Sequence, residues 1–210
     1  MPSILTLALI CDHAYNDAGS VALGGARRIH VPNAHRINNS GTSFFGAAYQ
    51  LSECGIIAFR GTKESEDFLD ADAEILKRRL PVGQLGDAFA YFSVAEPALR
   101  ALQCSRFIVT GHSLGGGLAE RVAARVSRVP IAGVTFNAPG LMGFSQAGSS
   151  ASLNIPTRNQ NILNIRSAGD LVSQWGQHIG RMISLPDSGL HTLGPLIEKL
   201  AESPTGLVRV

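Results

Sequence analysis

The sequence predicts an α/β fold in which a mostly parallel sheet is covered by helices on both faces. Short, nearly continuous apolar runs, typical of strands buried on both sides, alternate along the chain with longer helical segments. The chain has 210 residues, 45% of them hydrophobic and 16% charged, which is enough to build a sizeable globular core. Neither an internal repeat nor a linker interrupts this pattern, so we expect residues 1–210 to form a single domain.

The N-terminal apolar run, residues 4–10, is expected to be a helix packed on the domain. Seven residues are too few to cross a bilayer, no basic residue precedes the run, and no small-residue cleavage pattern follows it. We therefore expect a cytoplasmic protein by default, with export by a leaderless route as the alternative. The cysteines, Cys11, Cys54 and Cys104, are odd in number and widely separated, which favours buried thiols over disulfides or a zinc site.

The remaining elements follow in chain order from their composition and period. Strand-like segments occur at 45–51, 56–61, 106–110, 131–137, 161–167 and 180–186. Helical segments occur at 65–80, 86–102, 114–129 and 193–202. Ser52 to Gly55 form a turn between the first two strands, and Pro97 is expected to kink or shorten the second helix. Residues 141–161, rich in Ser, Asn and Gly, are expected to border an acyl groove, to form a mobile gate, or to be an ordinary surface loop.

A glycine-rich turn between a strand and a helix, "FIVTGHSLGGGLAE", carries the strongest chemical signal. Ser113 lies between Gly111 and Gly115 in the pattern G-x-S-x-G. The turn is so tight that side chains at the two glycines would collide with neighbouring backbone, and it lifts the serine oxygen clear of the sheet at the positive end of the following helix. An ordinary glycine-rich turn is the alternative. The strand before and the helix after favour a nucleophile elbow, and with it the α/β-hydrolase fold.

A nucleophilic serine needs a base, and the base needs a carboxylate that orients it. In an α/β-hydrolase these follow in the order serine, acid, histidine. Asp170 comes directly after the strand at 161–167, and no other acidic residue lies between Glu120 and Asp187. We therefore predict Asp170 as the acid, with a turn-capping aspartate as the alternative.

Two histidines follow the predicted acid. His191 lies beyond the strand at 180–186, whereas His178 precedes that strand and is expected at the opposite edge of the sheet. A base must lie at the same edge as the elbow, so we predict His191 as the base, with His178 as a surface or core-capping histidine. Were residues 171–178 to fold back over the site, His178 would be the base instead. His112, next to the nucleophile, is expected to pack against neighbouring loops.

An oxyanion hole needs two N–H groups aimed at the position where negative charge develops. The residue after the nucleophile, Leu114, supplies one. Thr62, at the end of "GIIAFRGT", is expected to supply the other from its backbone, with its hydroxyl as a further donor.

Taken together, these segments resemble the class 3 lipase family of α/β-hydrolases, including short bacterial lipase-like proteins. The matching pieces are "IIAFRGT", "EDFLDAD", "VTGHSLGGGLA", "TFNAPG", "GDLV" and a late histidine, in family order. The resemblance implies hydrolysis of carboxyl esters of glycerolipids without a metal or other cofactor. It assigns the triad to Ser113, Asp170 and His191 and the oxyanion hole to Thr62 and Leu114.

The expected function is therefore a serine hydrolase that cleaves lipid carboxyl esters, either acylglycerols or phospholipids. A small-ester esterase or a thioesterase with the same site is the alternative, and a non-catalytic binding module would require a broken triad. The expected partner is a lipid ester substrate, with transient contact with a membrane surface as a further option. A net charge of +2, with one dense basic run at 77–79, argues against nucleic acid. The sequence has no pair of histidines at helical spacing and no close pair of cysteines, so we expect no metal site.

Overall fold

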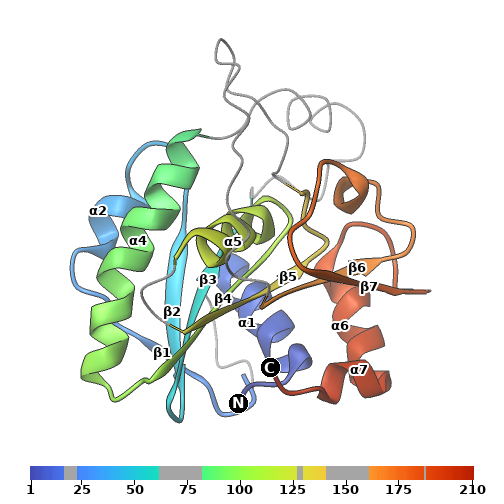
Figure 1. Ribbon diagram of the computed structural model, residues 1–210, viewed down its shortest axis with the longest axis horizontal. Helices are drawn as coiled ribbons and strands as arrows, with labels where there is room; N and C mark the ends of the chain where they lie inside the picture. Colours follow the sequence, from blue (N-terminus) through green and yellow to red (C-terminus); the bar gives the residue numbers. More distant parts are fainter. Residues whose placement is uncertain (17–22, 62–81, 127–129, 141–160, 187) are drawn as a thin grey trace.

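The centre of the molecule is a sheet, which the computed structural model resolves together with its flanking helices (Figure 1). The structure describes residues 1–16, 23–61, 82–126, 130–140, 161–186 and 188–210. Within these residues the sheet has seven strands in the order β1-β2-β3-β4-β5-β6-β7. The strands are β1 (Arg27–Ile29), β2 (Gly46–Leu51), β3 (Cys54–Phe59), β4 (Arg106–His112), β5 (Ile131–Phe136), β6 (Ile162–Ser167) and β7 (Arg181–Leu185).

Strand direction divides the sheet into two parts. β1 pairs with β2, and β2 with β3, in antiparallel fashion, whereas β3 to β7 are parallel throughout. The β2–β3 hairpin turns at Ser52, which has a φ of 52°. The predicted, mostly parallel sheet is thus confirmed. Because β3 to β7 are parallel, their carboxyl ends all meet at one edge, and the loops that leave this edge are brought together.

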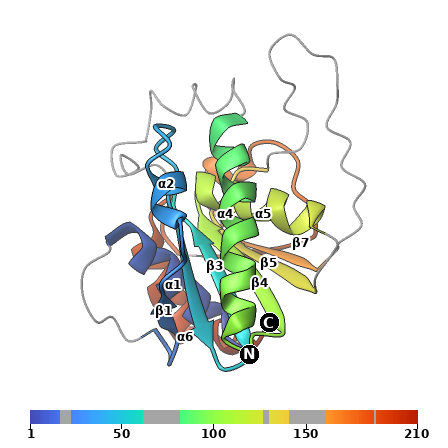
Figure 2. The same cartoon turned by 90° about the vertical axis from the view of Figure 1, so that its left-hand side faces the viewer.

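Helices cover both faces of the sheet, as predicted. They are α1 (Ile4–Asn16), α2 (Ala34–Asn38), α4 (Val82–Ala101), α5 (Leu114–Arg125), the 3-10 turn η1 (Val172–Gln174), α6 (Leu193–Glu202) and α7 (Pro204–Leu207). Viewed along the sheet, α1 and α6 lie on one side and α4 and α5 on the other (Figure 2). No helix in the described part of the chain has both the length and the apolar character needed to span a bilayer.

The two faces bury separate hydrophobic clusters, which explains why the central strands are apolar along most of their length. Along β3, Ile56 and Ala58 pack with α1 and α6, whereas Ile57 and Phe59 pack with α4 and α5. Side chains alternate between faces in a strand, so a sheet covered on both sides needs apolar residues throughout. Each fully buried Ile or Phe contributes about 1.5–3 kcal/mol to stability by leaving water. All three cysteines are buried and free, as predicted.

Most of the described elements agree with the predictions within a few residues. The N-terminal helix extends to Asn16, and α5 ends at Arg125. The helix predicted over 86–102 begins at Val82 and continues through Pro97 to Ala101. It does not stop early, because buried residues at helical spacing, among them Ala95 and Leu99, hold it against the sheet. The predicted helix over 65–80 lies outside the described residues, as do residues 141–160 of the loop predicted over 141–161.

Candidate active site

The candidate site begins at the turn where β4 leads directly into α5. Ser113 has a φ of 56° and a ψ of −134°, a combination that a residue with a side chain rarely adopts. A Cβ atom at Gly115 would overlap the carbonyl oxygen of Phe59, and one at Gly111 would overlap the backbone of Gly115. The backbone N–H of Ser113 donates to the carbonyl of Phe136 on β5, at 3.0 Å. The turn therefore has the steric properties that the G-x-S-x-G pattern predicts.

Three side chains from three separate segments meet at this turn. The Nε2 atom of His191 lies 2.8 Å from the Ser113 hydroxyl, and its Nδ1 atom lies 3.0 Å from Oδ1 of Asp170. Ser113 is 3% exposed, Asp170 1% and His191 7%. In a neutral imidazole, Nδ1–H donates to the carboxylate and Nε2 accepts from the hydroxyl. The structure thus brings together the three residues that the sequence predicts as a triad, in an arrangement that can remove a proton from the serine.

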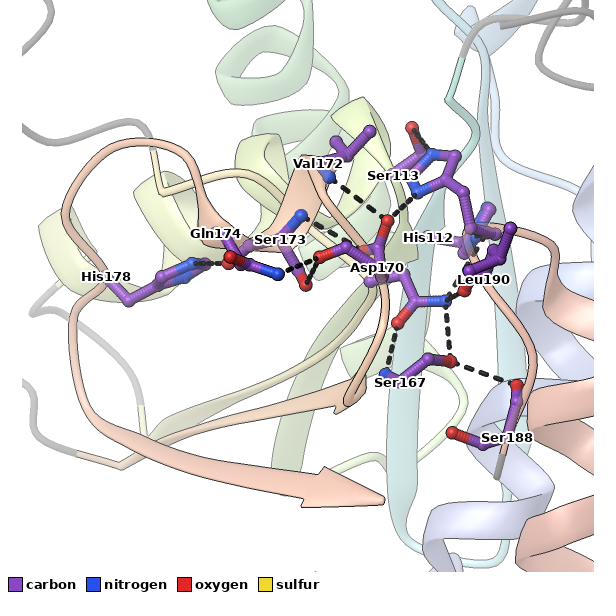
Figure 3. A network of polar contacts seen from close by, with 12 residues as sticks. His112, Ser113, Ser167, Asp170, Val172, Ser173, Gln174, His178, Ser188 and Leu190 are labelled. Atoms are coloured by element: carbon purple, nitrogen blue, oxygen red, sulfur yellow. Dashed lines mark hydrogen bonds and ion pairs between the residues drawn. The ribbon is translucent and has the colours of Figure 1, made fainter. Parts of the chain in front are cut away.

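The Asp170 carboxylate is held by the backbone that follows it. The N–H of Val172 donates to Oδ1 at 3.1 Å, and the N–H of Ser173 donates to Oδ2 at 3.0 Å (Figure 3). The Ser173 hydroxyl also donates to the Asp170 carbonyl, at 3.1 Å. Asp170 therefore caps η1 as well as contacting His191, so the turn-capping alternative and the predicted site are two aspects of one arrangement.

Asn137, at the end of β5, hydrogen-bonds the backbone of the loop that carries His191. The Nδ2 atom of Asn137 donates to the Leu190 carbonyl at 3.0 Å and lies 3.4 Å from the His191 carbonyl. Its Oδ1 accepts the backbone N–H of Ser167, at 2.7 Å. Asn137 is fully buried and has a φ of 44°. We did not assign a role to this residue from the sequence. The signal that could have revealed it is an asparagine directly after a buried strand, within "TFNAPG".

His112 packs against the loop of His191, as predicted, and also against Tyr15 of α1, which was not predicted. Both of its ring nitrogens have partners. Nε2–H donates to the carbonyl of His191 at 2.7 Å, and Nδ1 lies 3.2 Å from the hydroxyl of Tyr15. Burial, aided by the nearby His191, lowers the pKa of His112 to about 3. His112 is therefore neutral at physiological pH and serves as a buried hydrogen-bonding residue.

His178 lies on the segment that leads from Asp170 to β7. Its Nδ1 atom is 3.0 Å from Oε2 of Glu120 on α5, and its Nε2 atom is 3.0 Å from the carbonyl of Ser173. We expected this histidine at the opposite edge of the sheet from the elbow. This expectation is wrong, because His178 contacts Ser173, which follows Asp170 closely in the chain. The buried carboxylate of Glu120, which also accepts the N–H of Ile179 at 3.0 Å, holds His178 beside α5 instead. The sequence did not reveal this ion pair, because its partners are far apart in the chain.

Electrostatics at the His178–Glu120 pair differ from those at His112. Burial lowers the pKa of His178, but the hydrogen bond and charge of Glu120, with the Ser173 carbonyl, outweigh it and raise the pKa above its ordinary value. Burial raises the pKa of Glu120, and the bonds from His178 and Ile179 offset part of that shift. When Glu120 is ionised, both acceptors require a ring N–H, so this geometry favours the doubly protonated imidazolium of His178.

Of the two residues predicted to form the oxyanion hole, the structure describes Leu114 and not Thr62. Leu114 is the first residue of α5, a position at which the backbone N–H has no acceptor within the helix. Thr62 lies outside the described residues. Its neighbour Gly61 donates its N–H to the hydroxyl of Tyr15, at 3.0 Å. In the described ranges, no group of three or more His, Cys, Asp or Glu side chains is arranged to hold a metal ion.

Several solved structures similar to this chain are fungal lipases of low sequence identity. A lipase of Rhizomucor miehei, in complex with its propeptide, superposes with a TM-score of 0.61 at 13% identity, covering 87% of this chain and 67% of the other. The Lip2 lipase of Yarrowia lipolytica gives 0.54 at 16% identity, covering 89% and 78%. A triacylglycerol lipase of Penicillium expansum gives 0.56 at 18% identity, covering 88% and 79%. These similarities confirm the α/β-hydrolase fold.

Family membership follows from the sequence match itself. A search of curated proteins found no significant match. The model of a phospholipase-like family, the Tle-like phospholipase domain, matches residues 6–178, a segment that includes Ser113 and Asp170 and ends before His191. The predicted resemblance to lipases is thereby confirmed, and the chain belongs to the Tle-like phospholipase domain family.

Proposed function

We propose that this protein is a serine hydrolase that cleaves carboxyl esters of lipids, with a phospholipid as the first substrate to test. The observation that carries the proposal is the continuous arrangement of Ser113, His191 and Asp170 at the strained turn after β4. Membership of a phospholipase-like family supports a lipid ester over a small ester or a thioester. All three side chains are present and in contact, which argues against a non-catalytic binding module.

The geometry supports a two-step reaction through an acyl-enzyme. His191 Nε2 takes the proton of Ser113 as the hydroxyl oxygen attacks the ester carbonyl, and the Asp170 carboxylate stabilises the imidazolium that forms. The developing oxyanion accepts the N–H of Leu114 and, by resemblance, that of Thr62. His191 then gives its proton to the leaving alcohol. A water molecule, activated by the same nitrogen, hydrolyses the acyl-enzyme and releases a fatty acid.

Product analysis on a mixed lipid extract tests the proposal. We expect the native protein to release fatty acids and lysophospholipids, and Ser113→Ala to lose about 10⁴-fold or more in rate, because the nucleophile is gone. Ser93→Ala, which removes an exposed hydroxyl on α4, is the matched control and should retain the native rate. A Ser113→Ala rate within tenfold of native contradicts the proposal.

Two further measurements separate the alternatives. A fluorophosphonate probe should label the native protein and Ser93→Ala but not Ser113→Ala, since only an activated serine reacts. Absence of labelling in the native protein would point to a binding module. A series of esters and thioesters of increasing acyl length distinguishes a lipid-ester hydrolase, which should prefer long acyl esters, from an esterase for small substrates or a thioesterase.

A further inference from the structure

Beyond the triad, a chain of buried and partly buried hydrogen bonds joins four separate segments of the protein. The N–H of Gly61, in the turn after β3, donates to the Tyr15 hydroxyl on α1 at 3.0 Å. The same hydroxyl lies 3.2 Å from Nδ1 of His112, in the nucleophile turn. His112 Nε2–H donates to the carbonyl of His191 at 2.7 Å. The chain thus runs from the turn that precedes Thr62 to the backbone of the base.

The direction of each hydrogen bond is determined by chemistry. The His191 carbonyl can only accept, so the proton of His112 is on Nε2. A neutral imidazole then has a free acceptor at Nδ1, toward which Tyr15 donates its proton while accepting the N–H of Gly61. Burial raises the pKa of Tyr15, so the hydroxyl keeps its proton. A longer contact of 3.4 Å from this hydroxyl to the His112 carbonyl is the one competing acceptor among the described contacts.

We propose that Tyr15 is a positioning residue. Its hydroxyl acts through His112 to fix the position of the turn after β3 relative to the base His191. This inference rests on the proposed function, since it assigns a role within the same site. Tyr15 touches none of the reacting atoms in the described contacts; it acts on the two loops that supply them.

Packing around the hydroxyl leaves little freedom for another arrangement. The ring of His112 lies 5.0 Å from that of His191 and 5.8 Å from that of Tyr15, between centroids. A Cβ atom at Gly61 would overlap the Tyr15 hydroxyl and come within 2.9 Å of the His112 carbonyl. The backbone of the turn can therefore approach Tyr15 only because residue 61 is glycine.

Loss of the hydroxyl would leave a donor at Gly61 and an acceptor at His112 without a partner among the described residues. Such buried groups are unfavourable, and the turn is expected to shift to satisfy them. A displacement of about 1 Å in a catalytic group can reduce the rate about 10²-fold. Loss of one neutral hydrogen bond to a positioning residue is a smaller change, so we expect a loss of about tenfold in kcat.

Tyr15→Phe is the test, and Tyr91→Phe is the matched control, because Tyr91 is a buried tyrosine on α4, in the hydrophobic cluster on the other face of the sheet from α1. We expect Tyr15→Phe to lower kcat about tenfold on a soluble ester with KM nearly unchanged, and Tyr91→Phe to leave both near native. An unchanged kcat in Tyr15→Phe, or an equal loss in both variants, overturns the inference. Failure of the proposed function would instead appear as an inactive native protein.

Nitrogen NMR of the imidazoles provides a readout that does not depend on activity, and the part measured on the native protein does not depend on folding of a variant. In the native protein, His112 should remain neutral with its proton on Nε2 from about pH 5 to 9, unlike an exposed histidine. In Tyr15→Phe the His112 Nδ1 resonance should move, whereas in Tyr91→Phe it should not. A proton on Nδ1 in the native protein, or titration of His112 within that range, overturns the inference.

Discussion

His191 and His178 offer a direct comparison within one molecule. Both follow Asp170 in the chain, and each places Nδ1 3.0 Å from a buried carboxylate, Asp170 in one case and Glu120 in the other. They differ at Nε2. In His191 this atom faces the Ser113 hydroxyl at 2.8 Å, whereas in His178 it donates to the carbonyl of Ser173 at 3.0 Å.

The partner of the second nitrogen separates a base from a structural cation. A hydroxyl can donate to Nε2, so His191 is able to be neutral and accept a proton. A carbonyl can only accept, so Nε2 of His178 must carry a proton and cannot take one from a substrate, and Nδ1 carries a second proton when Glu120 is ionised. A histidine beside a buried carboxylate is therefore insufficient to identify a catalytic pair, and the predictions below test this distinction.

The largest effect is expected at His191. His191→Ala removes the proposed base and should lower kcat on a soluble ester by about 10⁴–10⁶-fold, because the serine hydroxyl is then not activated. Thermal unfolding should remain cooperative, which separates lost chemistry from lost structure. A fall of less than tenfold would show that His191 is not the base.

The two carboxylates should differ next. Asp170→Asn keeps the shape of the side chain but no longer orients or stabilises the imidazolium, and we expect a loss of about 10⁴-fold in kcat. Glu120→Gln makes the same chemical change beside His178 and should alter kcat only severalfold. Equal losses in the two variants would contradict the assignment of Asp170 as the acid.

His178 should matter for stability more than for rate. His178→Ala leaves the Glu120 carboxylate buried with only the Ile179 N–H as a described partner, so we expect a loss of about 3 kcal/mol in the free energy of unfolding, measured in urea at pH 6. Its kcat, measured well below the unfolding temperature, should remain within severalfold of native. A loss comparable to that of His191→Ala would exchange the roles of the two histidines.

The smallest expected effect is a pH dependence of stability with opposite signs at two histidines. The pKa of His178 is raised in the folded protein, so its contribution is complete below its ordinary pKa of about 6.5 and is lost as pH rises through the folded value. The pKa of His112 is lowered to about 3, so its contribution is complete above about 6.5 and is lost on acidification.

Urea unfolding between about pH 4 and 9 measures the loss of stability on the acidic side and on the alkaline side. The decline on the alkaline side should disappear in His178→Gln, and the decline on the acidic side should persist in that variant. If the alkaline decline survives in His178→Gln, another group is responsible for it.

Local pattern and chain order predicted the features of this fold that depend on neighbouring residues. The central strands and the glycine turn were readable because each depends on a few adjacent positions. His191 could be chosen over His178 because β7 pairs in parallel with β6, from Leu163 opposite Arg181 to Ser167 opposite Leu185, which brings the end of β7 beside Asp170.

Contacts between distant segments were not readable in the same way. Tyr15 meets His112 across 97 residues, and Glu120 meets His178 across 58, and neither pair has a local pattern. β1 and α2 were missed because they are three and five residues long and none of their residues is fully buried, so they show no hydrophobic period. Sequence reasoning thus selected the three side chains that the structure brings together and missed the residues that hold them.

The backbone of Ser113 has a consequence for how this protein balances folding against reactivity. A serine at a φ of 56° and a ψ of −134° carries strain of about 1–3 kcal/mol that a glycine there would largely relieve. At the position of the proposed nucleophile, a substitution by glycine would therefore improve stability while removing the reactive hydroxyl. Selection for thermal stability alone would tend to convert such an enzyme into a more stable but inactive protein.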